Sequence, residues 1–299
     1  MGNDRSLEGR VALVTGAGRG LGRAYAYALA DRGAKVVVNN RSAAAGDEVV
    51  AEIGRRGAEA TGAHGDLEDP ATARAIVDTA IATYGKLDIL INNAGGIDAP
   101  LAPFAEMTAA DRDACLRQNF TSTWDVTAAA WPHLLDQGYG RVILTASPMS
   151  VYGGPGFAHY SAAKSALIGL CRVLVVEAGD KDVKVNVINP VANTRKEPQE
   201  GAWNAWFEEA FSVDYVADGV AWLVDERCTA TGEIFTLGAA RMAQVSITEQ
   251  RGLIQEIPSF APEAIGEQFD TVFDGGAPVQ FRTITEYLGF YSQLYGAPA

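Results

Sequence analysis

The stretch RVALVTGAGRGLG at residues 10–22 joins a short apolar run to a loop rich in glycine. A pattern typical of a helix, RAYAYALADRGA, follows at once and stops at Gly33. Glycines between a strand and a helix let the backbone approach a pyrophosphate, and the free N–H groups of the helix N-terminus face it. A tight turn alone would also favour glycine, but the place of this loop predicts a dinucleotide site. Its predicted contacts are Gly16, Gly18, Arg19, Gly20, Leu21 and Gly22.

Similar apolar runs recur at 35–40, 87–93, 141–146 and 183–188, with helical patterns between them. These runs are nearly continuous in Val, Ile and Leu, which indicates strands that are covered on both faces. Strands that alternate with helices form βαβ units and a parallel sheet. The sequence therefore predicts an α/β protein with a single-domain Rossmann fold, a doubly wound parallel sheet of about seven strands.

The last predicted strand is IFTLG at 234–238, and the pattern beyond it becomes helical and rich in aromatic residues. No linker rich in Pro, Gly or Ser marks a domain boundary. We therefore expect residues 1–240 to form the dinucleotide-binding and catalytic domain. Residues 241–299 are predicted to form a helical extension, packed on the same domain or on a partner subunit.

Composition narrows the class of protein. The formal net charge of −13 argues against binding to a nucleic acid backbone, which needs clustered Lys and Arg. No apolar run approaches the ~20 residues that span a bilayer, and the N-terminal MGNDRSLEGR lacks the apolar core of a signal peptide. Cys115, Cys171 and Cys228 match no metal-ligand spacing. We predict a cytoplasmic protein with no metal, nucleic acid or membrane partner.

The second strand ends in VVVNNRS, where the ribose of the adenosine would lie. A carboxylate at this point binds the ribose 2′-OH of NAD and repels the 2′-phosphate of NADP, but the chain has Asn40 here, followed by Arg41. Arg19 lies within reach in the glycine-rich loop. Two guanidinium groups favour a phosphate, so the sequence predicts NADP(H) as the preferred cofactor, with NAD(H) also accepted. The alternative is that both arginines are solvated surface residues.

Further motifs follow in a fixed order: NNAG at 92–95, then Asn119, Ser147, Tyr160 and Lys164. Together with TGAGRGLG they resemble the short-chain dehydrogenase/reductase family over residues ~8 to ~240. Within that family, AAWPHLLDQGYGRVILTAS and TASPMSVYGGPGFAHYSAAK are similar to the (3R)-hydroxyacyl-CoA dehydrogenase units of multifunctional enzymes type 2. Those relatives carry an acid at the position of Asn40.

The resemblance implies a role for each of these residues. Tyr160 would be the general acid and base, and Lys164, one helical turn further on, would stabilise the phenolate and hold the nicotinamide ribose. A free phenol, with a pKa of about 10, needs such help at neutral pH. Ser147 would stabilise charge on the substrate oxygen. Asn119 would anchor a water that links Lys164 to solvent.

The resemblance also implies where cofactor and substrate lie. Beyond the glycine-rich loop, Tyr160 and Lys164, the cofactor contacts would be Asn40, Arg41, Asp66, Leu67, Asn93, Ala94, Gly95, Pro190 and Thr194. The substrate contacts would be Ser147, Met149, Tyr152, Tyr160, Trp203 and Trp206. The two tryptophans follow an irregular stretch at 190–202, where they would serve as a substrate lid or simply as core. Two departures from the family pattern, Pro148 and Val191, would alter how substrate or nicotinamide sits.

These features predict an NAD(P)(H)-dependent oxidoreductase that interconverts a secondary alcohol and a ketone. The substrate would be hydrophobic, either a 3-hydroxyacyl thioester or a cyclic, steroid-like or aromatic compound. Coenzyme A would need basic residues, for which Arg195 and Lys196 are the obvious candidates. A dinucleotide-binding sensor without catalysis is the alternative. The apolar outer face of the helix at roughly 158–178 predicts a homodimer or homotetramer.

Overall fold

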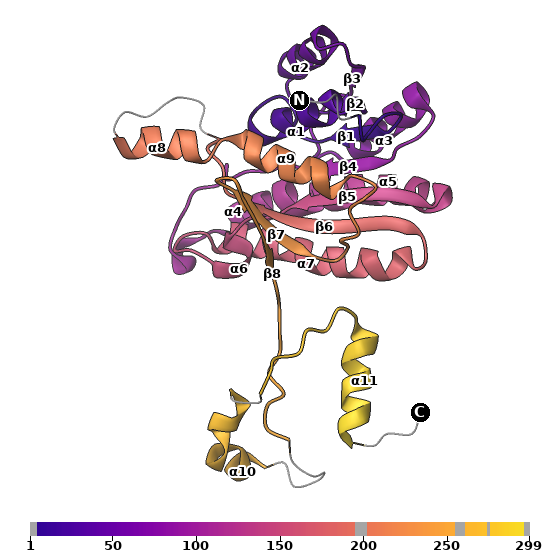
Figure 1. The fold of residues 1–299 in the computed structure, drawn as a ribbon. Helices are drawn as coiled ribbons and strands as arrows, with labels where there is room; N and C mark the ends of the chain where they lie inside the picture. The colour runs from indigo at the N-terminus through magenta and orange to yellow at the C-terminus, as the bar shows by residue number, and fades with distance from the viewer. Residues whose placement is uncertain (1–4, 195–201, 255–260, 274–275, 296–299) are drawn as a thin grey trace. The chain divides into compact units, whose positions relative to one another are not determined.

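The structure is a computed structural model that describes residues 5–194, 202–254, 261–273 and 276–295 (Figure 1). Within these ranges eight strands form one sheet in the order β3-β2-β1-β4-β5-β6-β7-β8. The strands are β1 (Val11–Val14), β2 (Lys35–Val38), β3 (Ala60–Gly62), β4 (Ile89–Asn92), β5 (Tyr139–Thr145), β6 (Asp182–Pro190), β7 (Ile234–Gly238) and β8 (Arg241–Val245).

Neighbouring strands from β3 to β7 pair in parallel, so that Val14 of β1 lies opposite Val38 of β2 and next to Ile91 of β4. All four residues of β1 are buried, as expected for a strand covered on both faces. The strand order reverses between β1 and β4, where ligands bind in doubly wound folds. The predicted doubly wound Rossmann fold is confirmed.

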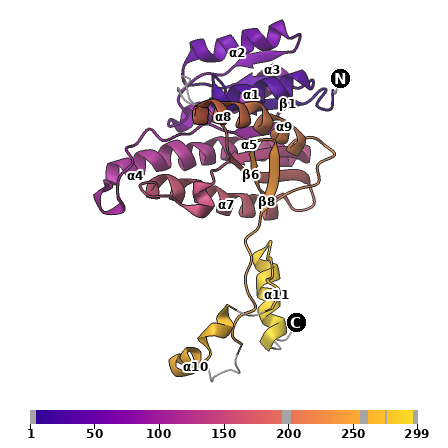
Figure 2. The same cartoon turned by 60° about the vertical axis from the view of Figure 1, so that its left-hand side comes forward.

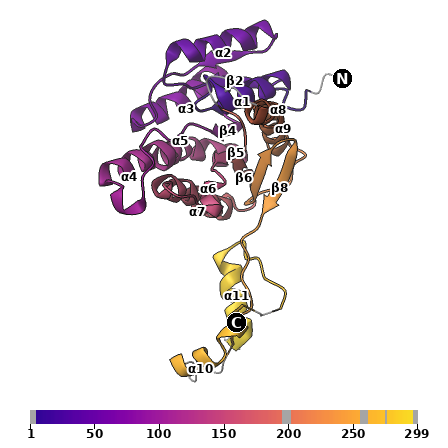
Figure 3. The same cartoon turned by 90° about the vertical axis from the view of Figure 1, so that its left-hand side faces the viewer.

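The helices of the unit that contains the sheet lie on both faces (Figures 1 and 3). On one face α1, α2 and α9 share a core with the apolar side chains of the sheet, and on the other α3, α5 and α7 pack on it. The bounds are α1 (Gly20–Asp31), α2 (Ala43–Arg55), α3 (Pro70–Tyr84), α4 (Ala109–Leu116), α5 (Ser122–Gln137), α6 (Met149–Tyr152), α7 (Ala158–Ala178), α8 (Ala202–Ala210) and α9 (Val213–Leu223).

The chain after β7 begins as a strand, whereas the sequence led us to expect helix from residue 241. Ala239 and Ala240, both with positive φ (48° and 55°), form the two-residue connection to β8. Such a turn matches the twist of two antiparallel strands and makes a hairpin. Hydrogen bonding to the edge of β7 thus makes residues 241–245 a strand. Their polar and apolar residues do not alternate clearly enough to predict a strand from the sequence.

Residues Val245–Ala299 form a second compact unit, separate from the unit Met1–Gln244 (Figure 2). It contains α10 (Pro262–Glu267), a 3-10 turn (Phe269–Val272) and α11 (Ile284–Tyr295). Aromatic rings of Phe281, Tyr287 and Phe290 pack together within this unit. The predicted domain boundary at 240 and the packing of the extension on a domain or a subunit stay predictions. Among the described helices, none is both long and apolar enough to cross a bilayer.

Candidate active site

The glycine-rich loop lies between β1 and the first turn of α1, and its shape depends on missing side chains. Gly16 and Gly20 have φ of 63° and 52°, a region that favours glycine. A Cβ on Gly22 would lie 2.3 Å from the carbonyl oxygen of Gly16. Asn93, at the end of β4, donates from Nδ2 to the Thr15 carbonyl at 2.9 Å. The loop is therefore pressed between α1 and β4, and the N–H groups of Gly16, Ala17 and Gly18 are bonded to Asn39 and Asn40 after β2.

Asn40 and Arg41 lie at the end of β2, beside this loop. The Gly18 N–H donates to Asn40 Oδ1 at 3.3 Å, and Asn40 Nδ2 donates to the Ser42 carbonyl at 2.9 Å. A Cβ on Gly18 would lie 2.6 Å from the Asn40 side chain. The Arg41 guanidinium is exposed and lies 3.9 Å from the carboxylate of Asp66. The Asn40 amide thus closes one side of the loop, while Arg41 keeps its charge accessible.

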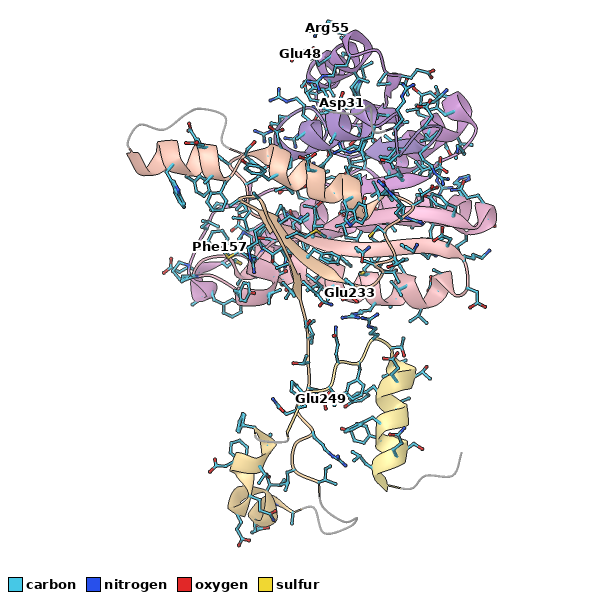
Figure 4. The ribbon with its side chains drawn as sticks, in the orientation of Figure 1. Asp31, Glu48, Arg55, Phe157, Glu233 and Glu249 are labelled. Atoms are coloured by element: carbon cyan, nitrogen blue, oxygen red, sulfur yellow. The ribbon has the colours of Figure 1, made fainter. Side chains whose placement is uncertain are left out.

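Helix α7 carries Tyr160 and Lys164. Lys164 is 3% exposed, and its Nζ donates to the Thr145 carbonyl at the end of β5 at 2.8 Å. The Nζ lies 5.8 Å from the centre of the Tyr160 ring. Phe157, labelled in Figure 4, meets the same ring edge to face, with centroids 6.5 Å apart. The buried ammonium and the half-buried phenol therefore lie close together, as their spacing on a helix predicts.

Asn119 lies beside Lys164, in a π-helical turn (Arg117–Thr121) between α4 and α5. Its Oδ1 accepts from the Gly96 N–H and its Nδ2 donates to the Gly96 carbonyl, both at 2.9 Å. A Cβ on Gly95 would lie 2.7 Å from Asn119 Oδ1 and 3.1 Å from Lys164 Nζ. Asn119 therefore holds the chain after NNAG closely enough to keep this backbone against the ammonium.

Ser147 follows β5, and Pro148 directly precedes the short helix α6. The Met149 N–H donates to Ser147 Oγ at 3.2 Å, and the Ser150 N–H donates to the Ser147 carbonyl at 2.9 Å. Proline is tolerated at the start of a helix because the first N–H groups there have no partner within the helix. Pro148 thus starts a turn whose backbone polarises the Ser147 hydroxyl and leaves its proton free to donate.

Burial shapes the pKa values of both ionisable groups. Burial raises the pKa of Tyr160, and a hydrogen bond from Ser147 acts in the opposite direction. Burial also lowers the pKa of Lys164 to about 8. The sequence suggested that Lys164 lowers the pKa of the phenol. In this state burial has the largest effect on the pKa of each group, because desolvation disfavours both charged forms.

A cavity of about 690 Å³ connects these parts. Every cofactor contact expected from the sequence lines it, from Gly16 in the loop to Thr194 after β6. The described residues that line this cavity do not include Asn119, Ser147, Met149, Tyr152 or Trp206. The structure thus brings the expected cofactor residues together with the phenol and the ammonium, and of the substrate candidates whose side chains are described only Tyr160 lines this cavity.

The predicted substrate residues differ in their surroundings. Tyr152 is 74% exposed, and Trp206 is half exposed with its ring against Phe211 at 5.6 Å between centroids. Trp203 belongs to α8, but its side chain lies outside the described residues, as do Arg195 and Lys196. Val191 fits because its neighbour, Gly238 of β7, has no side chain. A Cβ on Gly238 would lie 2.2 Å from the carbonyl oxygen of Val191 and 2.9 Å from its Cβ.

Sequence reasoning missed some residues of the cavity. Thr145 acts through its backbone carbonyl, which no residue type reveals. Gln118 Nε2 donates to Asp98 Oδ2 at 2.6 Å, and both side chains line the cavity. Gln118 directly precedes Asn119, so its place in the sequence could have identified it as a residue near the site. Asp98 lies in an irregular loop without periodicity, so only the fold shows its position.

Comparison with known proteins gives these features a context. The family described as short chain dehydrogenase matches residues 10–200. The chain belongs to this family. It is thus an NAD(P)-dependent oxidoreductase that acts on CH–OH groups. The cavity fits such a dinucleotide, because the glycine-rich loop at its wall has no room for side chains at Gly18 or Gly22. The glycine-rich loop, the strand reversal and the cavity meet at one edge of the sheet.

Two solved structures and one curated protein are similar over most of the chain. The peroxisomal multifunctional enzyme type 2 of Mus musculus is 35% identical over 97% of this chain and 40% of that protein. The full-length enzyme of that name from Drosophila melanogaster has a TM-score of 0.80 at 28% identity, over 97% of this chain and 51% of that chain. A short chain dehydrogenase from Mycobacterium avium has a TM-score of 0.79 at 29% identity, over 92% and 98%. The chain spans less than two thirds of the length of the first two proteins.

Gly22→Ala tests the shape of the loop. The added methyl group would meet the Gly16 carbonyl, so we expect the dissociation constant of the dinucleotide to rise at least about tenfold, or about 1.4 kcal/mol. Gly54→Ala on α2 is the matched control, because its Cβ would meet nothing within 4 Å. Quenching of protein fluorescence measures both constants. Equal affinity of the Gly22→Ala protein and the wild type would contradict this account of the loop.

Lys164→Met removes a buried ammonium. The charged form opposes folding, so we expect the variant to have a higher Tm than the wild type near neutral pH without cofactor. The pKa of Lys164 is about 8 in the folded protein against 10.5 ordinarily. The penalty is therefore complete below about pH 8 and is relieved towards about pH 10.5, because there the unfolded chain binds more protons. Calorimetry should show a Tm difference that narrows across this window, and a constant difference would refute the assignment.

Proposed function

We propose that this protein interconverts a secondary alcohol and a ketone on a hydrophobic substrate, using Ser147, Tyr160 and Lys164 and preferring NADP(H). The observation that carries this proposal is the shared cavity: Tyr160 and Lys164 line the same space as the whole glycine-rich loop. A half-buried phenol and a buried ammonium have no structural reason to lie together beside a dinucleotide cradle. Such groups occur where a proton must be moved.

In the direction of reduction, Tyr160 gives its proton to the carbonyl oxygen of the substrate. The bound nicotinamide supplies a hydride for the carbonyl carbon and, in the reverse direction, accepts one. Ser147 Oγ accepts from the Met149 N–H, so its own proton is available for the oxygen on which charge develops. Without substrate that same proton is directed at the phenol, where it lowers the pKa of Tyr160.

Lys164 would hold the cofactor ribose and support the phenolate. Its ammonium is buried and is bonded to the Thr145 carbonyl, which leaves two further N–H groups for other partners. Asn119 and the chain at Gly95 lie directly beside it. A proton that leaves Tyr160 would be replaced along the Lys164 side of the cavity, where the Asn119 amide and the Gly96 backbone are hydrogen-bonded to each other.

The preference for NADP(H) rests on Arg19 and Arg41. Both line the cavity at its adenosine end, and Asn40 stands where an acid would repel a 2′-phosphate. Both bonds of the Asn40 side chain go to nearby backbone, to Gly18 and Ser42, so it contributes no charge. Two accessible guanidinium groups in this position match a phosphate in geometry and charge.

The proposed substrate is a 3-hydroxyacyl thioester or a cyclic, steroid-like or aromatic alcohol or ketone. Support comes from exposed apolar side chains: Leu101, Phe104 and Tyr152 are all exposed, and a Cβ on Gly156, which follows α6, would lie 3.6 Å from the Cβ of Leu101. An apolar rim favours a hydrophobic substrate body. Met149, Trp203 and Trp206 remain proposed substrate contacts.

A homodimer or homotetramer is part of the proposal. Val173 and Val176, on the outer face of α7, are 54% and 55% exposed. Branched apolar side chains that stay this exposed on a helix are typical of a surface between subunits. The cytoplasmic location stays a prediction, and several relatives are named as peroxisomal proteins.

Tyr160→Phe tests the mechanism. We expect dinucleotide binding to stay unchanged and carbonyl reduction to fall by about 10²- to 10⁴-fold, since the variant has no proton to give. Tyr84→Phe, on α3 and away from the cavity, is the matched control. A screen of alcohols and ketones with both cofactors measures activity by absorbance. Tight dinucleotide binding without turnover of any substrate by the wild type would instead favour a sensor without catalysis.

Arg41→Asp tests the choice of cofactor. Replacing the guanidinium by a carboxylate removes an attraction for a 2′-phosphate and adds a repulsion. We expect the ratio of kcat/KM for NADPH over NADH to fall by about 10- to 100-fold, as for loss of a charge-assisted bond. Arg74→Asp on α3 makes the same change in net charge outside the cavity and should leave the ratio unaltered. An unaltered ratio in Arg41→Asp would overturn the preference.

A further inference from the structure

A second polar network lies behind Ser147, outside the cavity that holds the cofactor residues. Ser150, one turn after Ser147, donates from Oγ to the Ser147 carbonyl at 2.6 Å. Its own carbonyl accepts from Ser165 Oγ at 2.7 Å, and Ser165 follows Lys164 on α7. Ser165 Oγ also lies 2.7 Å from the carbonyl of Ser161, the residue after Tyr160. Ser150 is thus bonded both to the Ser147 turn and to the helix that carries Tyr160.

The third member of this network is Asn189, near the end of β6. It is fully buried, and its Oδ1 lies 3.3 Å from Ser150 Oγ. Its Nδ2 has no hydrogen-bond partner within the described part of the chain. A buried amide N–H without a partner costs about 1–3 kcal/mol, so an asparagine at this place needs a reason.

The chemistry of the hydroxyl supplies that reason. Ser150 has one hydroxyl proton, and the short bond to the Ser147 carbonyl uses it. The contact with Asn189 therefore needs a donor from the amide. Exchanging the amide oxygen and nitrogen of Asn189 places Nδ2 against Ser150 Oγ, and the orphan position then holds an oxygen. An unpaired carbonyl oxygen is tolerated better than an unpaired N–H.

We propose that Asn189 and Ser150 are positioning residues for the reaction: a directed hydrogen-bond chain runs from the Asn189 amide through the Ser150 hydroxyl to the Ser147 carbonyl. The chain fixes the turn that Pro148 begins, and Ser165 fixes the same turn against α7. Ser147 Oγ is thereby held at a set distance from Tyr160. This inference rests on the proposed function of Ser147 and Tyr160.

Asn189→Ala and Ser150→Ala test the proposal. We expect kcat for the ketone to fall by about 10- to 100-fold, the scale of an error of about 1 Å in placement, while the dissociation constant of the dinucleotide stays within about twofold. Ser150→Thr keeps the hydroxyl and should restore most of the activity. Asn186→Ala is the matched control, because Asn186 is also a buried asparagine of β6, but its amide bonds Ala230 and Glu233.

A second readout separates positioning from stability. Besides burial, two groups act on the pKa of Tyr160: the Ser147 hydroxyl lowers it, and the Cys115 thiol of α4 raises it. Lys164 lies on α7, the helix that also carries Tyr160. Displacing Ser147 removes the lowering contact. In the oxidative direction Tyr160 acts as the base, so the rise of kcat/KM with pH should move to higher pH in both alanine variants.

The same shift should be visible without turnover. Ultraviolet absorbance of tyrosinate, compared between each variant and its Tyr160→Phe counterpart, reports the pKa of Tyr160 directly. Asn186→Ala should lower the Tm and leave this pKa unchanged. Unchanged kcat and unchanged pKa in both alanine variants would overturn the inference, as would an equal pKa shift in Asn186→Ala. A wild type that turns over no alcohol or ketone would refute the proposed function instead.

Discussion

Helix α1 can begin against the end of β1 only because residue 22 has no side chain. The Gly16 carbonyl occupies the space that a Cβ would need, at 2.3 Å, and Asn93 of the neighbouring strand holds that carbonyl and the one before it. This close approach fixes where α1 starts and therefore where its free N–H groups point. The cavity, the order of the strands around it and the place of the adenosine end all follow from this contact.

A second constraint comes from burying an ammonium. Lys164 loses its water and receives one carbonyl in return, from Thr145 at the carboxyl end of β5. Burial lowers the pKa of Lys164 to about 8 and raises that of Tyr160, so the charged form of each group costs free energy in the state described here. An anionic cofactor in the same cavity would stabilise the charged form of the lysine. The site therefore gives up folding stability to hold a group that suits its ligand.

The two halves of the proposed site are specified to different degrees by the sequence. The cofactor half could be read from it, because a glycine-rich loop between a strand and a helix has few other uses and parallel strands bring their carboxyl ends to one edge. The substrate half could not. Tyr152 and Trp206 follow the right strands but lie outside the cavity, since short helices such as α6 place a side chain by local packing rather than by periodicity.

By itself the sequence determined the doubly wound sheet and the residues that line the dinucleotide cavity, because apolar runs, glycines and one helical turn from Tyr160 to Lys164 act over short distances along the chain. Tertiary structure alone decided the rest. It turned residues after Gly238 into an edge strand, placed the Thr145 carbonyl under Lys164, and brought Asn189 of β6 behind the Ser147 turn. Backbone carbonyls and buried amides find their hydrogen-bond partners only when segments far apart in the sequence come together. No local sequence pattern predicts which segments do so.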